Sequence, residues 1–171
     1  MFDALRNLIS DLTNVEPEAA KFEEGDYRLA AAALLFHIAD VDGVVTEAER
    51  RQLKEIVSRT FQLDSADATR LIAAAEQSDH EAVDFFHFTS VLKRALDFEG
   101  RLTLIELLWD MAMADGIVHE FEENVIWRVA ELLGISSRDR ITLRQRVVAR
   151  AETGVTDLSA TLAPLVSKPT S

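Results

Sequence analysis

The stretch LLFHIADVDGVVTEAE at residues 34–49 decides the fold, because residues 107–122 repeat it as LLWDMAMADGIVHEFE. Eight of the sixteen positions are identical at a constant offset of 73 residues, where chance would give about one match. Each copy has an apolar helical run, an Asp-Gly turn, a β-branched pair and two Glu residues that open a second helix. The repeat therefore predicts two related helical hairpins.

The composition predicts one soluble globular domain. The chain has 171 residues, of which 48% are apolar, and no cysteine. That length is sufficient for a substantial core, and the absence of cysteine excludes a disulfide framework, thiolate zinc and cysteine catalysis. The N-terminus lacks the basic segment and long apolar run of a signal peptide, and no apolar run approaches the ~20 residues of a membrane span. We therefore expect a cytoplasmic protein.

The charge is strongly negative overall and uneven along the chain. A formal net charge of −12 disfavours DNA or RNA as a partner, because phosphate contacts need a basic face. Near the C-terminus, however, one predicted helix carries five arginines, Arg138, Arg140, Arg144, Arg146 and Arg150, against Asp139 alone. This helix is interpreted either as a solvated basic face or as a docking face for an acidic partner or an anionic membrane surface.

Helical periodicity covers nearly the whole chain, and no stretch alternates as a strand would. The expected helices cover about 2–13, 26–39, 46–61, 64–77, 80–96, 99–113, 119–133 and 136–152. The prediction is an all-α, single bundle of about seven to eight helices, in which two helix–acidic turn–helix hairpins are related by a pseudo-two-fold axis. Residues 1–152 form the domain, with its core at about 26–150, and residues 153–171 form a flexible Ser-, Thr- and Pro-rich tail.

Apolar stripes on these helices predict the core. The first helix places Phe2, Leu5, Leu8, Ile9 and Leu12 on one face. The buried stripes expected in the two hairpins are Leu34, Leu35, Ile38, Leu53, Ile56 and Val57, and Leu107, Leu108, Met111, Ile126, Val129 and Ala130. The nine phenylalanines are expected in the core.

Several helix ends carry sequence signals. Thr46 with Glu49 forms the pattern of a capping box, and Ser78 with Glu81 repeats that pattern before the segment 80–96. Gly134 stands where a left-handed helix C-cap belongs. These signals support the helix boundaries given above.

The first Asp-Gly turn resembles part of a calcium-binding EF-hand loop. Its oxygen-bearing side chains are Asp40, Asp42, Thr46 and Glu49, which match positions three, five, nine and twelve of such a loop. Gly43 occupies the glycine position. Position one falls on Ile38, which cannot coordinate a cation, so the pattern predicts at most a partial site.

The second turn supplies fewer ligands. Asp115 and Glu122 match the first copy, and His119 takes the place of Thr46. Positions one and three fall on Met111 and Met113. The pattern is explained either by turn geometry and helix capping without a metal, or by a partial Ca²⁺ or Mg²⁺ site completed by water or by the other copy, with Zn²⁺ less favoured.

At these turns the chain resembles the TerB family of tellurite-resistance proteins and the related N-terminal domain of DjlA co-chaperones. The similarity rests on residues 38–49 and 111–122 and covers roughly residues 26–150. It implies an all-α bundle with an acidic surface, acidic residues proposed to bind metal, and a role in membrane-associated stress-response complexes at the inner face of the membrane. No J-domain motif is present, so co-chaperone activity is not implied.

Three functions follow. The leading hypothesis is a non-enzymatic TerB-like module that binds a divalent cation or a basic partner through its acidic turns in a tellurite-resistance-type stress response. The alternative is a purely structural protein-interaction module that docks through its Arg-rich helix, its acidic face or a groove of the bundle. The third is a metal-assisted hydrolase that uses clustered carboxylates.

Overall fold

The computed structural model describes residues 22–114, 116 and 118–153. Within them the chain forms helices and no strand: α3 (Tyr27–Ala39), α4 (Glu47–Phe61), α5 (Ser65–Glu81), α6 (Phe86–Ala95), α7 (Phe98–Ala112), α8 (Glu120–Leu132) and α9 (Ser137–Thr153). This confirms the predicted all-α bundle. The helix expected at 2–13 lies outside the described residues, as does the tail expected at 153–171 apart from Thr153, which ends α9.

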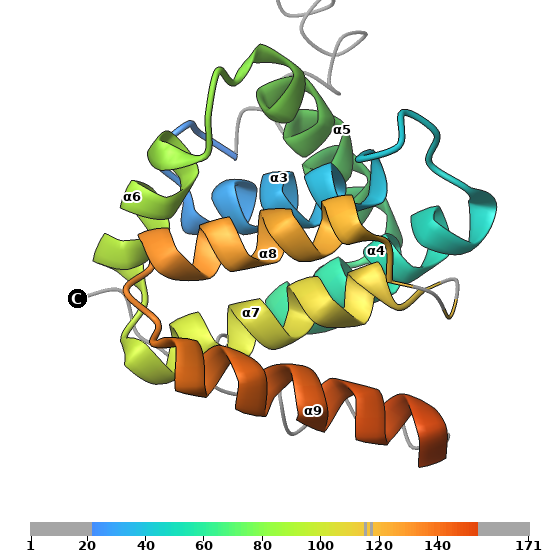
Figure 1. Cartoon of the computed structure of the whole chain (residues 1–171). Coiled ribbons are helices and arrows are strands. Elements are labelled where there is room, and N and C mark those ends of the chain that lie inside the picture. Colours follow the sequence, from blue (N-terminus) through green and yellow to red (C-terminus); the bar gives the residue numbers. More distant parts are fainter. Residues whose placement is uncertain (1–21, 115, 117, 154–171) are drawn as a thin grey trace, which may run out of the picture.

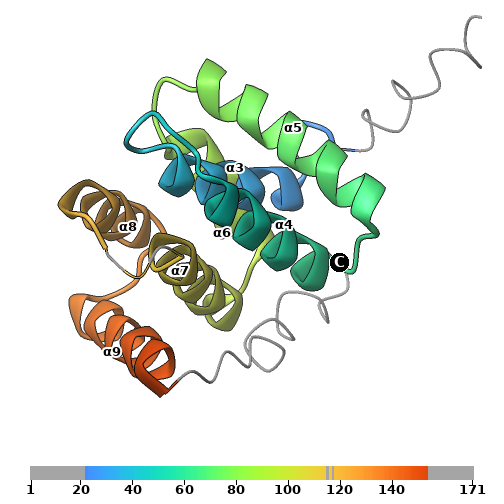
Figure 2. The same cartoon turned by 90° about the vertical axis from the view of Figure 1, so that its right-hand side faces the viewer.

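Helix α3 is the centre of the bundle. It packs against α4, α5, α6 and α7, and Figures 1 and 2 show it in the interior between α5 and α7. Its sequence explains this position, since alanine and leucine occupy nearly every face and only Tyr27, Arg28 and His37 are partly exposed. A helix that is apolar all round is stable only when it is surrounded by other helices.

Helix α7 is the second buried element, and it carries the outer helices α8 and α9 on its surface. Figure 1 shows α9 as the outermost helix, lying along α7. All twelve residues of the predicted hairpin stripes are buried, each at 2% exposure or less. The apolar pattern therefore predicted both hairpin cores correctly.

Two predicted helix ends are also confirmed. Thr46 and Glu49 form the reciprocal capping box at the start of α4. Gly134 has φ +75 after α8, and the Ile135 amide donates to the Ala130 carbonyl over 2.9 Å, a hydrogen bond typical of a glycine-terminated helix.

The capping box predicted at Ser78 and Glu81 is wrong. Helix α5 continues through both residues and ends at Glu81, and α6 starts only at Phe86. There the Asp84 Oδ1 atom accepts the Phe86 amide over 2.9 Å. The alanine-rich sequence of α5 has high helix propensity and carries the helix past the local signal.

The phenylalanine prediction is also wrong in part. Phe86 is 66% exposed, Phe121 73% and Phe98 45%, whereas Phe22, Phe36 and Phe88 are buried. The exposed side chains stand in the first turns of α6, α7 and α8, where a side chain can leave the apolar stripe without breaking the helix.

Candidate functional site

The first acidic turn is a compact backbone structure. Its amides close the turn, since the Asp40 amide donates to the Phe36 carbonyl and the Gly43 amide donates to the Asp40 carbonyl, both over 2.9 Å. Gly43 has φ +83, a conformation that glycine adopts without steric cost. The turn thus places Asp40 at the end of α3 and Asp42 on the exposed loop.

Three of the four predicted ligands in this turn have structural hydrogen bonds. Glu49, which is 7% exposed, accepts the Thr46 amide through Oε2 over 2.8 Å, and Thr46 Oγ1 accepts the Glu49 amide over 3.2 Å. Asp42 Oδ1 accepts the Val44 amide over 3.0 Å. These bonds satisfy backbone donors at the start of α4 and form an Asx-turn in the loop.

The fourth predicted ligand, Asp40, faces α5 rather than its own loop. Its Oδ2 atom lies 3.5 Å from His80 Nε2, and the His80 and Phe36 rings form a T-shaped contact. Asp40 therefore joins the turn to the end of α5.

The second turn has the same backbone pattern 73 residues later. The Met113 amide donates to the Trp109 carbonyl over 3.0 Å, and the Gly116 amide donates to the Met113 carbonyl over 2.9 Å. Gly116 also has φ +83. Asp115 lies outside the described residues. The pseudo-two-fold axis expected between the two hairpins stays a prediction.

The start of α8 corresponds to the start of α4. His119 is the N-cap residue with extended backbone, as Thr46 is for α4. Glu122 is buried at 7% exposure, the same value as Glu49. Across residues 22–114, 116 and 118–153, no three His, Cys, Asp or Glu side chains are gathered so that they could hold a metal ion.

A histidine–carboxylate pair that the sequence did not predict lies next to the first acidic turn, at the end of α3. His37 Nδ1 is 2.8 Å from Asp79 Oδ1, and the Asp79 side chain is only 7% exposed. The contact fits a hydrogen bond from the imidazole Nδ1–H to the carboxylate, because an ionised carboxylate can only accept. The pair joins α3 to α5 across 42 residues. A local sequence pattern does not predict a contact over that separation.

His37 and Asp79 line a hollow of about 480 Å³ at the connection between α5 and α6. Apolar lining comes from Val83, Phe85 and Phe86, and α8 contributes Arg128 and Leu132. The Phe85 ring meets the His37 imidazole edge to face at 4.8 Å. The hollow thus combines an apolar wall with a fixed imidazole.

Two apolar side chains stand exposed at this hollow. Val83 is 100% exposed and Phe86 is 66% exposed, and both line the hollow. We call these two residues the apolar ridge. Exposed apolar side chains beside a concave surface are typical of protein-interaction sites.

The Arg-rich helix α9 directs several of its arginines inward. Arg146 Nη1 donates to Glu106 Oε1 over 3.2 Å, and Arg150 Nη2 lies 3.8 Å from that atom and 3.6 Å from Asp110 Oδ1. Both carboxylates belong to α7 and are buried at 4% and 8% exposure. These contacts fix α9 to α7.

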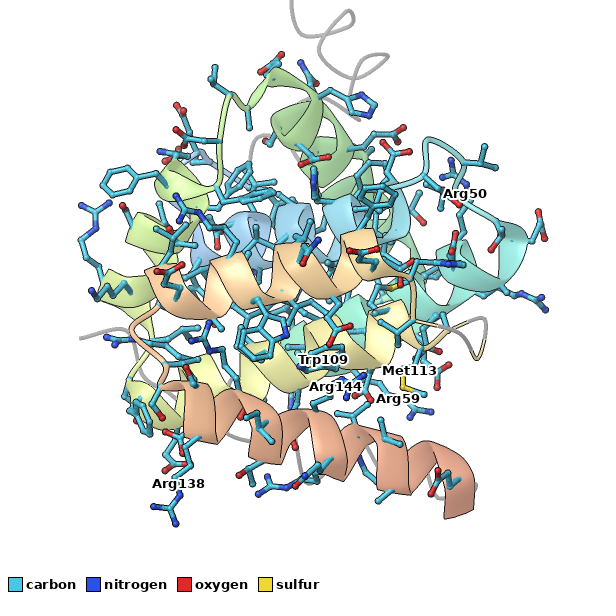
Figure 3. All side chains as sticks on the ribbon, viewed as in Figure 1. Arg50, Arg59, Trp109, Met113, Arg138 and Arg144 are labelled. Carbon is cyan, nitrogen blue, oxygen red and sulfur yellow. The ribbon has the colours of Figure 1, made fainter. Side chains whose placement is uncertain are left out.

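Two more arginines of α9 cover aromatic rings. Arg140 lies 4.7 Å above the Trp127 ring and donates to the Trp127 carbonyl. Arg144 lies 5.6 Å above the Trp109 ring, and Figure 3 shows the two side chains close together between α8 and α9. Arg138, by contrast, is exposed and points away from the bundle (Figure 3).

The buried Asp110 carboxyl is electrostatically perturbed. Burial raises the pKa of Asp110 to about 6, the Arg150 guanidinium opposes that rise, and the Glu106 carboxylate adds to it. The larger influence of burial is expected for a carboxyl that is withdrawn from water.

A second, larger hollow also borders the α5–α6 connection. It measures about 790 Å³ and is lined by residues of α3, α5 and α6 together with Phe22 and the connection itself. We call it the groove. Val83 borders both the groove and the smaller hollow.

Comparison with known families gives one result. A family model described as "Tellurite resistance protein TerB" matches residues 28–145. Neither the curated proteins nor the solved structures that were searched contain a match. In the part of the chain that the structure describes, no helix is both long and apolar enough to cross a bilayer. Since the TerB match covers well over half of the chain, this protein belongs to the TerB family.

Proposed function

We propose that this chain is a non-enzymatic binding module of a tellurite-resistance-type stress response, and that it works by docking a protein partner at the apolar ridge. The observation that carries the proposal is the exposure of Val83 and Phe86 at the mouth of a hollow of about 480 Å³. A net charge of −12 favours a partner with a basic surface around its apolar contact.

The surroundings of the ridge support docking. Apolar side chains that enter concave sites supply most of the binding energy in protein interfaces, and the hollow offers apolar walls at Phe85 and Leu132. Polar groups at its edge, His37 and Arg128, supply the hydrogen bonds that orient a partner. The stress-response setting is inferred from the family description.

The test compares two exposed phenylalanines. Full-length wild type, Phe86→Ser and Phe121→Ser are used as baits, and bound proteins are quantified by mass spectrometry. Phe121 is 73% exposed and lies in the first turn of α8, away from the ridge, so its variant is the matched control. We expect a partner that Phe86→Ser loses and Phe121→Ser retains. Equal recovery by both variants would contradict docking at the ridge.

The cellular setting has a separate test. Cells that lack this gene are grown on tellurite with each of the three proteins restored. We expect wild type and Phe121→Ser to restore growth and Phe86→Ser to fail at equal protein level. Unchanged tellurite sensitivity on deletion of the gene would contradict the stress-response assignment.

A second candidate function is binding of a divalent cation, Ca²⁺ or Mg²⁺, at the Asp-Gly turns. It is favoured by the shared backbone of the two turns, which carry Gly43 and Gly116 at the same φ of +83. Asp42 is exposed on its loop, where its carboxylate is accessible to a hydrated cation. Asp115 is the corresponding acid of the second turn.

Asp42→Asn tests this candidate sharply, because an amide oxygen still accepts the Val44 amide while the charge is lost. Isothermal titration with Ca²⁺, Mg²⁺ and Zn²⁺ is performed on wild type, Asp42→Asn, Asp115→Asn and the exposed control Asp84→Asn. We expect Asp42→Asn and Asp115→Asn to bind the cation more weakly than wild type, and Asp84→Asn to bind it with wild-type affinity. Absence of heat at millimolar cation in the wild type would rule out cation binding.

A further inference from the structure

One imidazole of the bundle is fixed on one side and open on the other. His37 Nδ1 lies 2.8 Å from Asp79 Oδ1, and the Phe85 ring packs against the imidazole with its centroid 4.8 Å away. The Asp79 side chain is 7% exposed, whereas the His37 side chain is 31% exposed and lines the hollow of about 480 Å³. Since the two nitrogens of an imidazole project in nearly opposite directions, Nε2 points away from Asp79. The described residues contribute no hydrogen bond to that nitrogen.

A histidine held in this way has the chemistry of a phosphoryl acceptor. When Nδ1–H donates to Asp79, the lone pair of the neutral ring lies on Nε2. Attack of that lone pair on phosphorus leaves the ring positively charged, and a buried carboxylate beside Nδ1–H stabilises this charge as it forms. A protein otherwise assists phosphoryl transfer by position and electrostatic stabilisation. His37 and Asp79 therefore supply the nucleophile and its stabilising charge.

Two features of the hollow supply positive charge for the transferred group. Arg128 of α8 lines the hollow together with His37, and its pair with Glu131 of the same helix is 3.5 Å long and exposed. Such a surface pair contributes little, so the guanidinium is available to bind phosphate oxygens. Helix α6 begins at the same hollow, and its N-cap residue Phe85 forms no side-chain cap hydrogen bond. The positive end of that helix adds to the field that favours an anion.

The two carboxylates that line the hollow already accept hydrogen bonds. Asp79 accepts from the His37 ring, and Asp84 Oδ1 accepts the Phe86 amide over 2.9 Å. Their negative charge opposes a phosphoryl group, and this opposition makes Arg128 necessary for holding one.

Two other histidines provide an internal comparison. His80 and His87 meet carboxylates through Nε2, at 3.5 and 3.7 Å, so the nitrogen that is open in His37 is the engaged one in them. Their side chains are 55% and 50% exposed, more than the 31% of His37. Solvent exposure alone would therefore favour modification of His80 and His87, whereas the surroundings of the ring favour His37.

We propose that His37 is a phosphoryl-acceptor histidine, modified on Nε2 by a donor whose phosphoryl group is bound to nitrogen, such as phosphoramidate or a phosphohistidine of another protein. A bond forms between Nε2 and phosphorus while the bond from phosphorus to the donor nitrogen breaks, and its electron pair stays on the donor. With a protonated donor nitrogen no proton has to move. Asp79 acts as a positioning residue, and Arg128 pairs with the phosphoryl oxygens. The proposal does not depend on the partner at the apolar ridge.

The test uses phosphoramidate and the full-length protein. Incorporation at each of the four histidines is followed over time by ³¹P NMR and tandem mass spectrometry. We expect His37 to be phosphorylated at several-fold the rate of the other three, with the acid lability of a phosphorus–nitrogen bond. His37→Gln should lose this fast phase, and the control His80→Gln should keep it. No incorporation at His37, equal rates at the four histidines, or a fast phase that His37→Gln retains would overturn the proposal.

Two further variants test the groups around the ring. Asp79→Asn keeps the size of the side chain and removes its charge, so we expect slower transfer to His37 and an unchanged rate at His87. Long-range ¹⁵N NMR identifies the protonated ring nitrogen, and we expect Nδ1–H for His37 in the wild type and a mixture of both forms in Asp79→Asn. Arg128→Ala should also slow the transfer, whereas Arg138→Ala, which changes an exposed arginine pointing away from the bundle, should not. A proton on Nε2 in the wild type, or wild-type rates in both Asp79→Asn and Arg128→Ala, would overturn the proposal.

Discussion

At the residue scale, the Asp110 carboxyl makes stability depend on pH between about 4 and 6. The folded protein holds the Asp110 proton up to about pH 6, whereas the unfolded chain releases it near the ordinary value of 3.8. Between these values the native state binds more protons, so the free energy of unfolding falls as pH rises through this window. A shift of about two units corresponds to about 3 kcal/mol.

Asp110→Asn removes this titration. We expect the variant to gain stability relative to wild type as pH rises from 4.5 to 7.5, by about 2 kcal/mol, because the amide never acquires the buried charge. Urea unfolding at pH 4.5, 5.5 and 7.5 measures the difference. Glu131→Gln changes an exposed carboxylate and serves as the control. A stability difference between Asp110→Asn and wild type that is constant over this range would contradict the prediction.

At the element scale, the two turns allow a matched comparison of glycines. Gly43 and Gly116 both have φ +83, and an added Cβ at either would meet nothing within 4 Å. Substitution by alanine therefore costs only the left-handed conformation, about 1 kcal/mol. We expect Gly43→Ala and Gly116→Ala to lose the same free energy of unfolding in urea titrations.

Gly25→Ala is the control for this pair. Gly25 also has open space around it but does not have a positive φ, so its variant should stay within about 0.5 kcal/mol of wild type. Unequal losses at Gly43 and Gly116 would mean that the two turns differ energetically in spite of their shared hydrogen bonds.

The helices themselves were largely predictable from the sequence. Apolar spacing identified the buried stripes of both hairpins, and the Thr46 capping box marked the start of α4. The Ser78 pattern failed because α5 continues through it to Glu81. A capping pattern ends a helix only where it outweighs the helix propensity of the flanking residues. The four-residue pattern alone therefore does not determine whether the helix ends there.

The candidate site was less predictable, because its contacts join distant parts of the chain. His37 and Asp79 are 42 residues apart, and Arg146 meets Glu106 across 40 residues. Spacing along one helix predicts which residues share a face, but it does not predict which other helix lies opposite. For the same reason the exposure of Phe86 could not be derived from its position in a phenylalanine-rich segment.

At the scale of the whole molecule, stability should decrease from the centre outward. Helix α3 packs against α4, α5, α6 and α7, whereas the main neighbour of α9 is α7. Elements with fewer buried contacts open at lower free energy. We expect amides of α9 to exchange through a local opening and those of α3 only on global unfolding, in native-state hydrogen exchange with increasing urea. Equal opening energies for α9 and α3 would contradict this order.

The two tryptophans give α9 an optical signal of its own. The chain contains only two, and each indole lies under an arginine of this one helix, Arg144 over Trp109 and Arg140 over Trp127. Intrinsic fluorescence therefore senses the departure of α9 before it senses the loss of the remaining helices. In a denaturant titration the emission change should precede the loss of circular dichroism at 222 nm, so that the unmodified protein reports the detachment of its outermost helix without any added label.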